Sequence, residues 1–117
     1  MSEARDIGRA AETHALAWLR RQGLTLLEAN YRCRAGELDL IMLEGDILVF
    51  VEVRSRRNAA FGSAAESVTA SKQRKLLTAA RHYLQYHEQH AGKAQRFDVI
   101  AITNGDMEWI KNAFGTD

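Results

Sequence analysis

The feature that most constrains this chain is a pair of apolar segments joined by a short polar break. Residues 47–53 are apolar at every position except Glu52. An extended segment that is apolar on both faces is typical of a strand at the centre of a sheet. Residues 36–43, Gly-Glu-Leu-Asp-Leu-Ile-Met-Leu, form the preceding strand, and the intervening Glu44-Gly45-Asp46 indicates a tight hairpin turn. The stretch therefore predicts a buried hairpin around which a sheet is built.

Carboxylates occur within these two apolar segments. Glu37 and Asp39 lie in residues 36–43. Glu52 lies in residues 47–53, two residues before Arg54. A buried carboxylate is costly unless it is paired, hydrogen-bonded or bound to a metal. Because side chains alternate along a strand, Asp39 and Glu52 share a face only if the hairpin loop holds an even number of residues. We expect a two-residue loop, which places the two carboxylates together.

The other elements follow from helical periodicity, glycine stops and turn residues. They are a helix over residues 3–22, a strand over 24–32, a helix from 69 or 70 to 89, a strand over 96–103, and a short strand over 107–111 after an Asn104-Gly105 turn. With the hairpin, the order is α-β-β-β-α-β-β. We expect one domain over residues 1–117, in the α/β (α+β) class, with a mixed sheet flanked by helices.

Composition restricts the compartment more than the function. The net charge of +1 does not by itself argue for a nucleic-acid partner, although arginines make up 12 of the 16 basic residues. The single Cys33 excludes an internal disulfide and a cysteine-rich zinc site. We find neither an apolar run that could span a bilayer nor a signal peptide, so we expect a cytoplasmic protein without a membrane partner.

Two further residues and one loop are expected to lie near the carboxylate pair. Glu12 lies beside the apolar stripe of the first helix, and Lys72 lies one turn before Leu76 and so faces the sheet. A basic loop that contains Arg56 and Arg57 follows the second strand of the hairpin. Loops carried by a rigid sheet are common places for substrate binding.

Two interpretations of the carboxylates remain open from the residues alone. In the first, Asp39 and Glu52 hold Mg²⁺ or Mn²⁺, Glu12 reaches the ion through a water, and Arg54 stabilises charge on a phosphate. In the second, the same groups form a structural ion-pair network. Its pairs would be Asp39 with Arg54, and Glu52 with Arg32 or Lys72.

Several motifs together resemble a known family. They are Gly8-Arg9-Ala10-Ala11-Glu12, Asn30-Tyr31-Arg32, Gly36-Glu37-Leu38-Asp39-Leu40-Ile41, Val49-Phe50-Val51-Glu52-Val53-Arg54, Lys72-Gln73, Arg96-Phe97-Asp98-Val99 and Trp109-Ile110-Lys111-Asn112-Ala113-Phe114. In order and spacing they resemble the uncharacterised bacterial YraN-like family. That family is similar to the restriction-endonuclease-like (PD-(D/E)xK) superfamily, which includes Holliday-junction resolvases.

The resemblance implies a restriction-endonuclease-like sheet with a metal site. The superfamily pattern places an acidic residue on the first helix, an Asp on the second strand and Glu-x-Lys on the third. Glu12, Asp39 and Glu52-Val53-Arg54 fall on those places. The implied activity is divalent-metal-dependent hydrolysis of phosphodiester bonds in branched or otherwise structured DNA. The residues expected to contact nucleic acid are Arg9, Arg32, Arg56, Arg57 and Lys72.

Arg54 departs from the superfamily pattern, which has lysine at that place. Arginine remains charged and cannot act as a general base. The alternative is therefore a nucleic-acid-binding module with weak or no catalysis. A further alternative is a protein-assembly module, for example a homodimer, whose aromatic side chains are exposed for contact. The candidates are Trp18, Phe61, Trp109 and Phe114.

Overall fold

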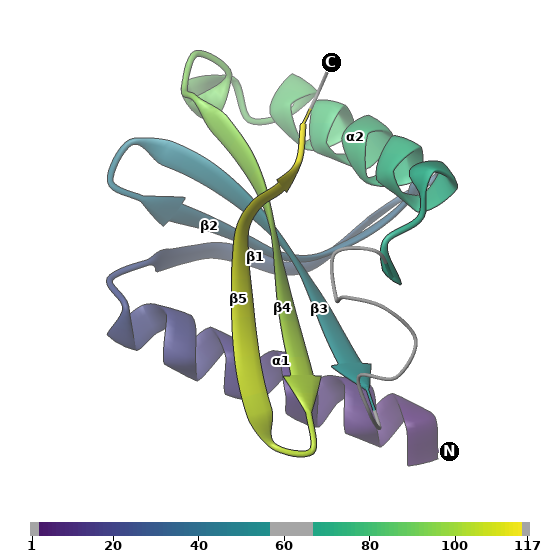
Figure 1. Cartoon of the computed structure of the whole chain (residues 1–117). Coiled ribbons are helices and arrows are strands. Elements are labelled where there is room, and N and C mark those ends of the chain that lie inside the picture. The colour runs from purple at the N-terminus through teal and green to yellow at the C-terminus, as the bar shows by residue number, and fades with distance from the viewer. Residues whose placement is uncertain (1–2, 57–66, 116–117) are drawn as a thin grey trace.

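The computed structural model describes residues 3–56 and 67–115, with the backbone alone for residues 3–7. Its elements follow the predicted order (Figure 1). They are α1 (Glu3–Arg21), β1 (Thr25–Cys33), β2 (Gly36–Glu44), β3 (Ile47–Arg56), α2 (Ala70–Gln85), the short 3₁₀ helix η2 (Glu88–His90), β4 (Gln95–Thr103) and β5 (Asp106–Phe114).

The strands form one mixed sheet in the order β1-β2-β3-β4-β5. Strands β3 and β4 are parallel, and the other neighbouring pairs are antiparallel. Strand β3 therefore lies at the centre, as its apolar sequence predicts, and four consecutive residues from Leu48 to Val51 are buried. The predicted mixed sheet flanked by helices is confirmed.

The helices cover opposite faces of the sheet (Figure 1). On the α1 side, Ala15 and Leu19 pack with Val49 and Val51 of β3. On the α2 side, residues Leu76 to Tyr83 pack with Leu48 and Phe50 of the same strand, among others. Alternation along β3 thus sends successive side chains into two separate cores. The first turn of α2 lies beside the second half of β3, where Lys72 forms an ion pair with Glu52.

The β2–β3 hairpin has the expected two-residue loop. Glu44 pairs with Ile47, and Gly45 and Asp46 form the turn, with Gly45 at a φ of 59°. Glycine adopts such a positive φ without the steric cost that a side chain brings. The register continues to Leu40 opposite Val51, so the next residues along the two strands are Asp39 and Glu52. The even loop is confirmed.

Two boundaries differ from the sequence-based expectation by more than one residue. The helix predicted to reach residue 89 ends at Gln85, because His87 leaves helical geometry and its Nδ1 lies 2.7 Å from the Tyr83 carbonyl oxygen. The last strand runs to Phe114 rather than 111. It continues through a bulge at which Asn112 takes a φ of 53° and donates its backbone N–H to Asp98 Oδ1 at 2.9 Å.

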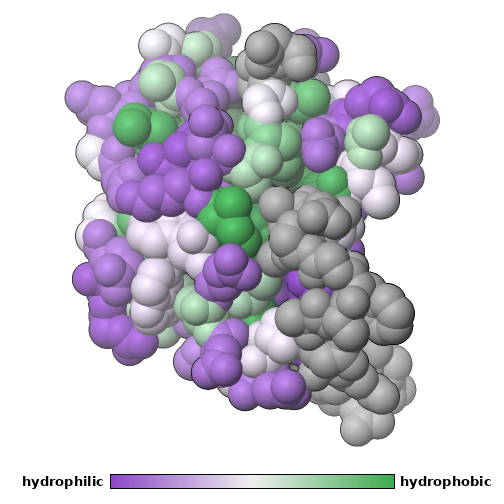
Figure 2. Space-filling view, viewed as in Figure 1, coloured by the Kyte–Doolittle hydropathy of each residue, from purple (hydrophilic) through white to green (hydrophobic). Residues whose placement is uncertain are grey.

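In the view of Figure 2, hydrophilic residues predominate at the left and along the top, and apolar residues appear near the middle. Trp18 and Trp109 are only partly exposed and contact each other edge to face, with ring centroids 5.4 Å apart. Phe114 packs against the core, and Phe61 lies outside the described residues. The expectation that Trp18, Trp109 or Phe114 is exposed is therefore wrong. Among the described residues, the large hydrophobic side chain that is exposed is Tyr86. No helix in residues 3–56 and 67–115 combines the length and apolarity needed to cross a membrane.

Candidate metal and phosphate site

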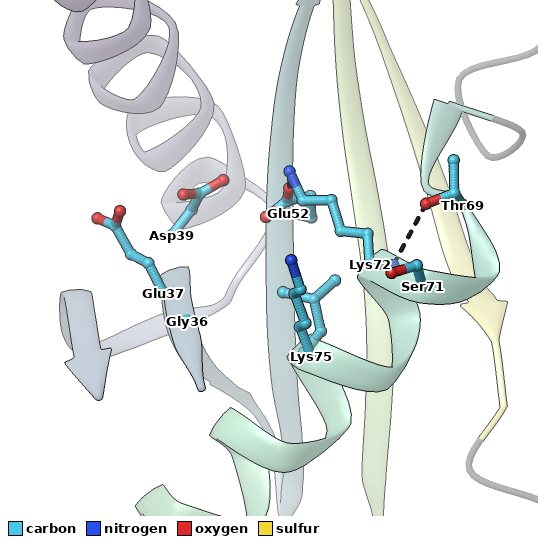
Figure 3. A pocket seen from close by; sticks show the side chains of 9 residues that line it. Gly36, Glu37, Asp39, Glu52, Thr69, Ser71, Lys72 and Lys75 are labelled. Carbon is cyan, nitrogen blue, oxygen red and sulfur yellow. Dashed lines mark hydrogen bonds and ion pairs between the residues drawn. The ribbon is translucent and has the colours of Figure 1, made fainter. Parts of the chain in front are cut away.

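A pocket of about 370 Å³ lies between the first half of β2, the second half of β3 and the first turns of α2 (Figure 3). Its floor carries the two carboxylates that the hairpin register brings together, and α2 contributes two lysines and two hydroxyl groups. The lining residues are Gly36, Glu37, Asp39, Glu52, Thr69, Ser71, Lys72, Lys75 and Leu76. The pocket thus combines oxygen donors at its base with cations at one side.

Asp39 occupies the point where the regular β2–β3 pairing stops. The backbone pairs end at Leu40 and Val51, and Asp39 Oδ2 then accepts a hydrogen bond from the Val53 N–H at 2.8 Å. The carboxylate therefore takes the place of a backbone acceptor on the neighbouring strand. This bond fixes Asp39 against β3, beside Glu52.

Glu52 is buried, with 6% of its surface exposed. Its Oε2 lies 2.7 Å from Lys72 Nζ and 3.5 Å from Arg54 Nη1. Lys72 is held at the start of α2, where its backbone N–H donates to the Oγ1 of the N-cap residue Thr69 at 3.2 Å. The expected ion pair between Glu52 and Lys72 is thus present.

The neighbouring carboxylates change each other's protonation. Burial, followed by the charge of Glu52, raises the pKa of Asp39 to about 8. A hydrogen bond with Glu52 and the charge of Glu12 act in the same direction, whereas the Val53 N–H opposes them. At neutral pH, Asp39 and Glu52 therefore carry one negative charge between them more readily than two. A cation bound between them would offset the unfavourable free energy of ionising both carboxylates.

Arg54 is turned away from the pocket. Its Nε donates to Ser67 Oγ at 3.3 Å and its Nη2 donates to the Ser67 carbonyl oxygen at 3.2 Å. Arg54 is not among the pocket-lining residues. Within the described part of the chain it forms an ion pair with Glu52 but none with Asp39, so the expected Asp39–Arg54 pair is not formed.

Glu12 lies in a neighbouring pocket of about 380 Å³, which shares Glu37 with the first. The Asn30 amide, with its nitrogen oriented toward the two carboxylates, donates to Glu12 Oε1 at 2.8 Å and to Glu37 Oε1 at 3.1 Å. Burial and then the charge of Glu37 raise the pKa of Glu12, and Glu52 adds to this effect. Glu12 is thus close enough to act electrostatically on the Asp39–Glu52 pair.

The basic residues expected to contact nucleic acid lie at different places. Arg9 and Arg32 line the second pocket, and Arg32 pairs with Glu37 at 3.6 Å rather than with Glu52. Lys72 lines the first pocket. Arg56 is at the end of β3 and is partly buried, and Arg57 lies outside the described residues.

The donor set matches the needs of a hard divalent cation. Mg²⁺ prefers oxygen ligands and is usually held by one or two carboxylates, with waters and phosphate oxygens completing its shell. Asp39 and Glu52 supply such a pair. Within residues 3–56 and 67–115, no group of three or more His, Cys, Asp or Glu residues is arranged to hold a metal. Glu12 therefore does not complete a three-carboxylate cluster.

Sequence reasoning missed a second buried carboxylate. Asp98 is fully buried on β4 and forms a bidentate pair with Arg96, at 2.8 and 2.9 Å. It also accepts hydrogen bonds from Trp109 Nε1 and the Asn112 N–H, both at 2.9 Å. Its acidic position in the apolar strand 97–102 was the available signal. Since its bonds come from protein groups, we assign Asp98 a structural role that joins β4 to β5.

Comparison with known proteins places this chain among similar ones of nearly equal length. The model of the family described as "Uncharacterised protein family UPF0102" matches residues 11–102. A UPF0102 protein of Stutzerimonas stutzeri (strain A1501) is 54% identical over 118 residues, which cover 97% of this chain and 98% of the relative. UPF0102 proteins of Saccharophagus degradans and Nitrosomonas europaea are 54% and 53% identical, each with 97% of this chain covered and with 97% and 98% of the relative covered, respectively.

Proposed function

The chain belongs to the UPF0102 family, an uncharacterised bacterial family, and from that premise we propose that it is a nucleic-acid-binding, divalent-metal-dependent endonuclease. Its substrate in this proposal is DNA of branched or otherwise structured form. The observation that carries the proposal is the meeting of Asp39 and Glu52 at the base of a pocket bordered by lysines. The single Cys33 fits the cytoplasm, where we place the protein.

Each group has a defined role in this proposal. Asp39 and Glu52 hold Mg²⁺ or Mn²⁺, and Glu12 strengthens the negative potential at the pair. A bound ion would polarise a phosphoryl oxygen and lower the pKa of a water. Lys72 and Lys75 contact the phosphate. Their positive charges offset the repulsion between the anionic phosphate and the two carboxylates.

The second pocket extends the surface available to a nucleic acid. Arg9 and Arg32 border it, and Glu37 connects it to the first pocket. Both arginines are exposed, so they are accessible to backbone phosphates. A strand that runs past both pockets would meet cations on either side of the carboxylate pair.

The superfamily resemblance supports the proposal by analogy. Glu12 lies on α1, Asp39 on β2, and Glu52 and Arg54 on β3. These are the elements that carry the acidic, Asp and Glu-x-Lys positions in restriction-endonuclease-like proteins. Fold-level analogy raises the expectation of nuclease chemistry, but the carboxylate geometry is the stronger argument.

A cleavage assay tests the proposal directly. Labelled four-way junction, flap, duplex and single-stranded DNA would be incubated with the protein and Mg²⁺ or Mn²⁺. We expect cleavage of at least one structured substrate, and its loss in Asp39→Asn. The matched control is Asp46→Asn, an exposed carboxylate in the hairpin turn. If none of these substrates is cleaved with either ion, the proposed endonuclease activity is rejected.

Arg54 favours one second candidate, a nucleic-acid-binding module without efficient catalysis. Its guanidinium is bonded to Ser67 and does not line the pocket, so no lysine from β3 assists the chemistry there. Binding in this case should weaken as salt increases, because association releases counter-ions from phosphates. Electrophoretic mobility shifts at low and high salt would measure this. An affinity that does not change with salt would argue against it.

A further inference from the structure

Two cations lie beside Glu52, and they are held differently. Lys72 Nζ is 2.7 Å from Glu52 Oε2, whereas Arg54 Nη1 is 3.5 Å from the same oxygen. Arg54 also makes two hydrogen bonds to Ser67, so its guanidinium has a second anchor. Among the described residues, the Lys72 ammonium has Glu52 as its ion-pair partner. Lys72 therefore forms the shorter contact and has fewer restraints.

The backbone of Lys72 is fixed while its side chain is free to turn. Thr69 caps the helix through the Lys72 N–H, and Gln73 Nε2 donates to the Val68 carbonyl oxygen at 3.0 Å on the same turn. The Lys72 side chain is 39% exposed and lines the pocket. A lysine side chain has four methylene groups between the backbone and the ammonium. Rotation about their bonds can move the ammonium away from Glu52 without any change in the helix.

The ammonium contacts a carboxylate that a divalent ion would need as a ligand. It contacts Oε2 of Glu52, and both residues line the pocket together with Asp39 (Figure 3). A cation that uses Glu52 as a ligand must replace this contact or share the carboxylate with it, and two cations that close repel each other. Displacement of the Lys72 ammonium by the divalent ion is then favoured over sharing of the carboxylate.

We propose that Lys72 is an exchangeable counter-ion, which holds Glu52 when no divalent ion is bound and is displaced toward the substrate phosphate when one binds. This inference rests on the proposed function, since it requires a divalent ion at Asp39 and Glu52. It deepens that function by making Lys72 a competitor of the metal and a partner of the phosphate. Metal and phosphate should consequently bind with positive coupling, because the metal frees the ammonium that the phosphate uses.

Calorimetric titration with Mn²⁺ alone, at pH 8, tests the competition without any measurement of activity. The proteins are wild type, Lys72→Met and the matched control Lys75→Met. Lys75 lines the same pocket and is exposed, and no ion pair joins it to Glu52 within the described residues. We expect Mn²⁺ to bind Lys72→Met about tenfold more tightly than wild type, which corresponds to about 1.4 kcal/mol. Lys75→Met should change the affinity by less than about twofold.

A second variant and a melting curve guard against a folding artefact. Lys72→Arg keeps the positive charge, so its Mn²⁺ affinity should stay at or below that of wild type. Thermal unfolding without metal identifies a variant that fails to fold; if Lys72→Met fails, Lys72→Gln, which also removes the charge, replaces it with the same expected result. Tighter Mn²⁺ binding by Lys72→Arg would overturn the inference.

The outcomes separate this inference from the proposed function. If wild type and Lys72→Met bind Mn²⁺ equally, or if Lys72→Met binds more weakly, Lys72 is not a competitor and the inference is wrong while the metal site stands. If both bind no Mn²⁺, the proposed metal site and the inference both fail. If Lys72→Met binds Mn²⁺ and wild type does not, the inference is supported in its strongest form.

Discussion

Replacing Asp39 by asparagine should stabilise the protein in alkaline solution, although it removes a charge from a buried pair. The pKa of Asp39 is raised from 3.8 to about 8, mainly by burial and the charge of Glu52. Between these values the folded protein retains a proton that the unfolded chain has released. The contribution of this group to the free energy of unfolding therefore falls as the pH rises from about 4 to about 8. Asparagine is neutral at every pH and escapes this loss.

The magnitude follows from the repulsion that appears when both carboxylates are ionised. Two unit charges about 4 Å apart repel by about 4 kcal/mol at an effective dielectric constant of about 20. Lys72 and Arg54 offset part of this, because both lie within 3.5 Å of Glu52. We expect the free energy of unfolding of Asp39→Asn, relative to that of wild type, to increase by about 2–4 kcal/mol between pH 5 and pH 9.

Urea unfolding at pH 5, 7 and 9, without divalent ions, measures this difference. The asparagine can keep the acceptor for the Val53 N–H, so the comparison isolates the charge. Asp46→Asn serves as the control, since that side chain is exposed in the hairpin turn, and its effect should be small at all three values. A loss of stability in Asp39→Asn that grows from pH 5 to pH 9 would refute the reasoning, because it would mean that ionised Asp39 is stabilised by a cation.

Three further predictions address other parts of the molecule. Asp98→Asn should cost about 3–5 kcal/mol in urea unfolding, because it removes the fully buried partner of the Arg96 guanidinium and leaves Glu44 as its remaining charged partner among the described residues; a loss under about 1 kcal/mol, no larger than that of the exposed Asp106→Asn, would contradict this. Mn²⁺ at about 100 times its dissociation constant should stabilise wild type by about 2.7 kcal/mol in thermal melts and leave Asp39→Asn unchanged; equal shifts would place the ion elsewhere. Arg32→Ala should reduce the slope of log affinity against log salt for DNA by about 1, and an unchanged slope would exclude a phosphate contact.

The local patterns were sufficient to predict the centre of the fold. The apolar run of β3 identified the central strand, and Gly45 identified the turn that sets the hairpin register. Register then placed Asp39 beside Glu52, because the period of a strand fixes which residues share a face. This part of the candidate site was predictable since it depends on residues close together in sequence.

The errors came from side chains that replace backbone partners. His87 bonds the Tyr83 carbonyl oxygen where α2 ends, and Asn112 enters a left-handed conformation within β5 while its N–H meets Asp98. Neither event follows from periodicity. The anchoring of Arg54 by Ser67 is likewise a contact between residues 13 positions apart, which periodicity does not reveal. Tertiary contacts of this kind lie beyond any local pattern.

The outer strands of the sheet have a consequence for how two molecules can meet. Strands β1 and β5 each have a break in register, and each contains an asparagine at positive φ, Asn30 at 56° and Asn112 at 53°. Such irregularities bend a strand and interrupt the outward row of N–H and C=O groups that another chain would need as a template. Continuous sheet growth from molecule to molecule is therefore disfavoured at both borders, and any homodimer must form through side chains or helices instead.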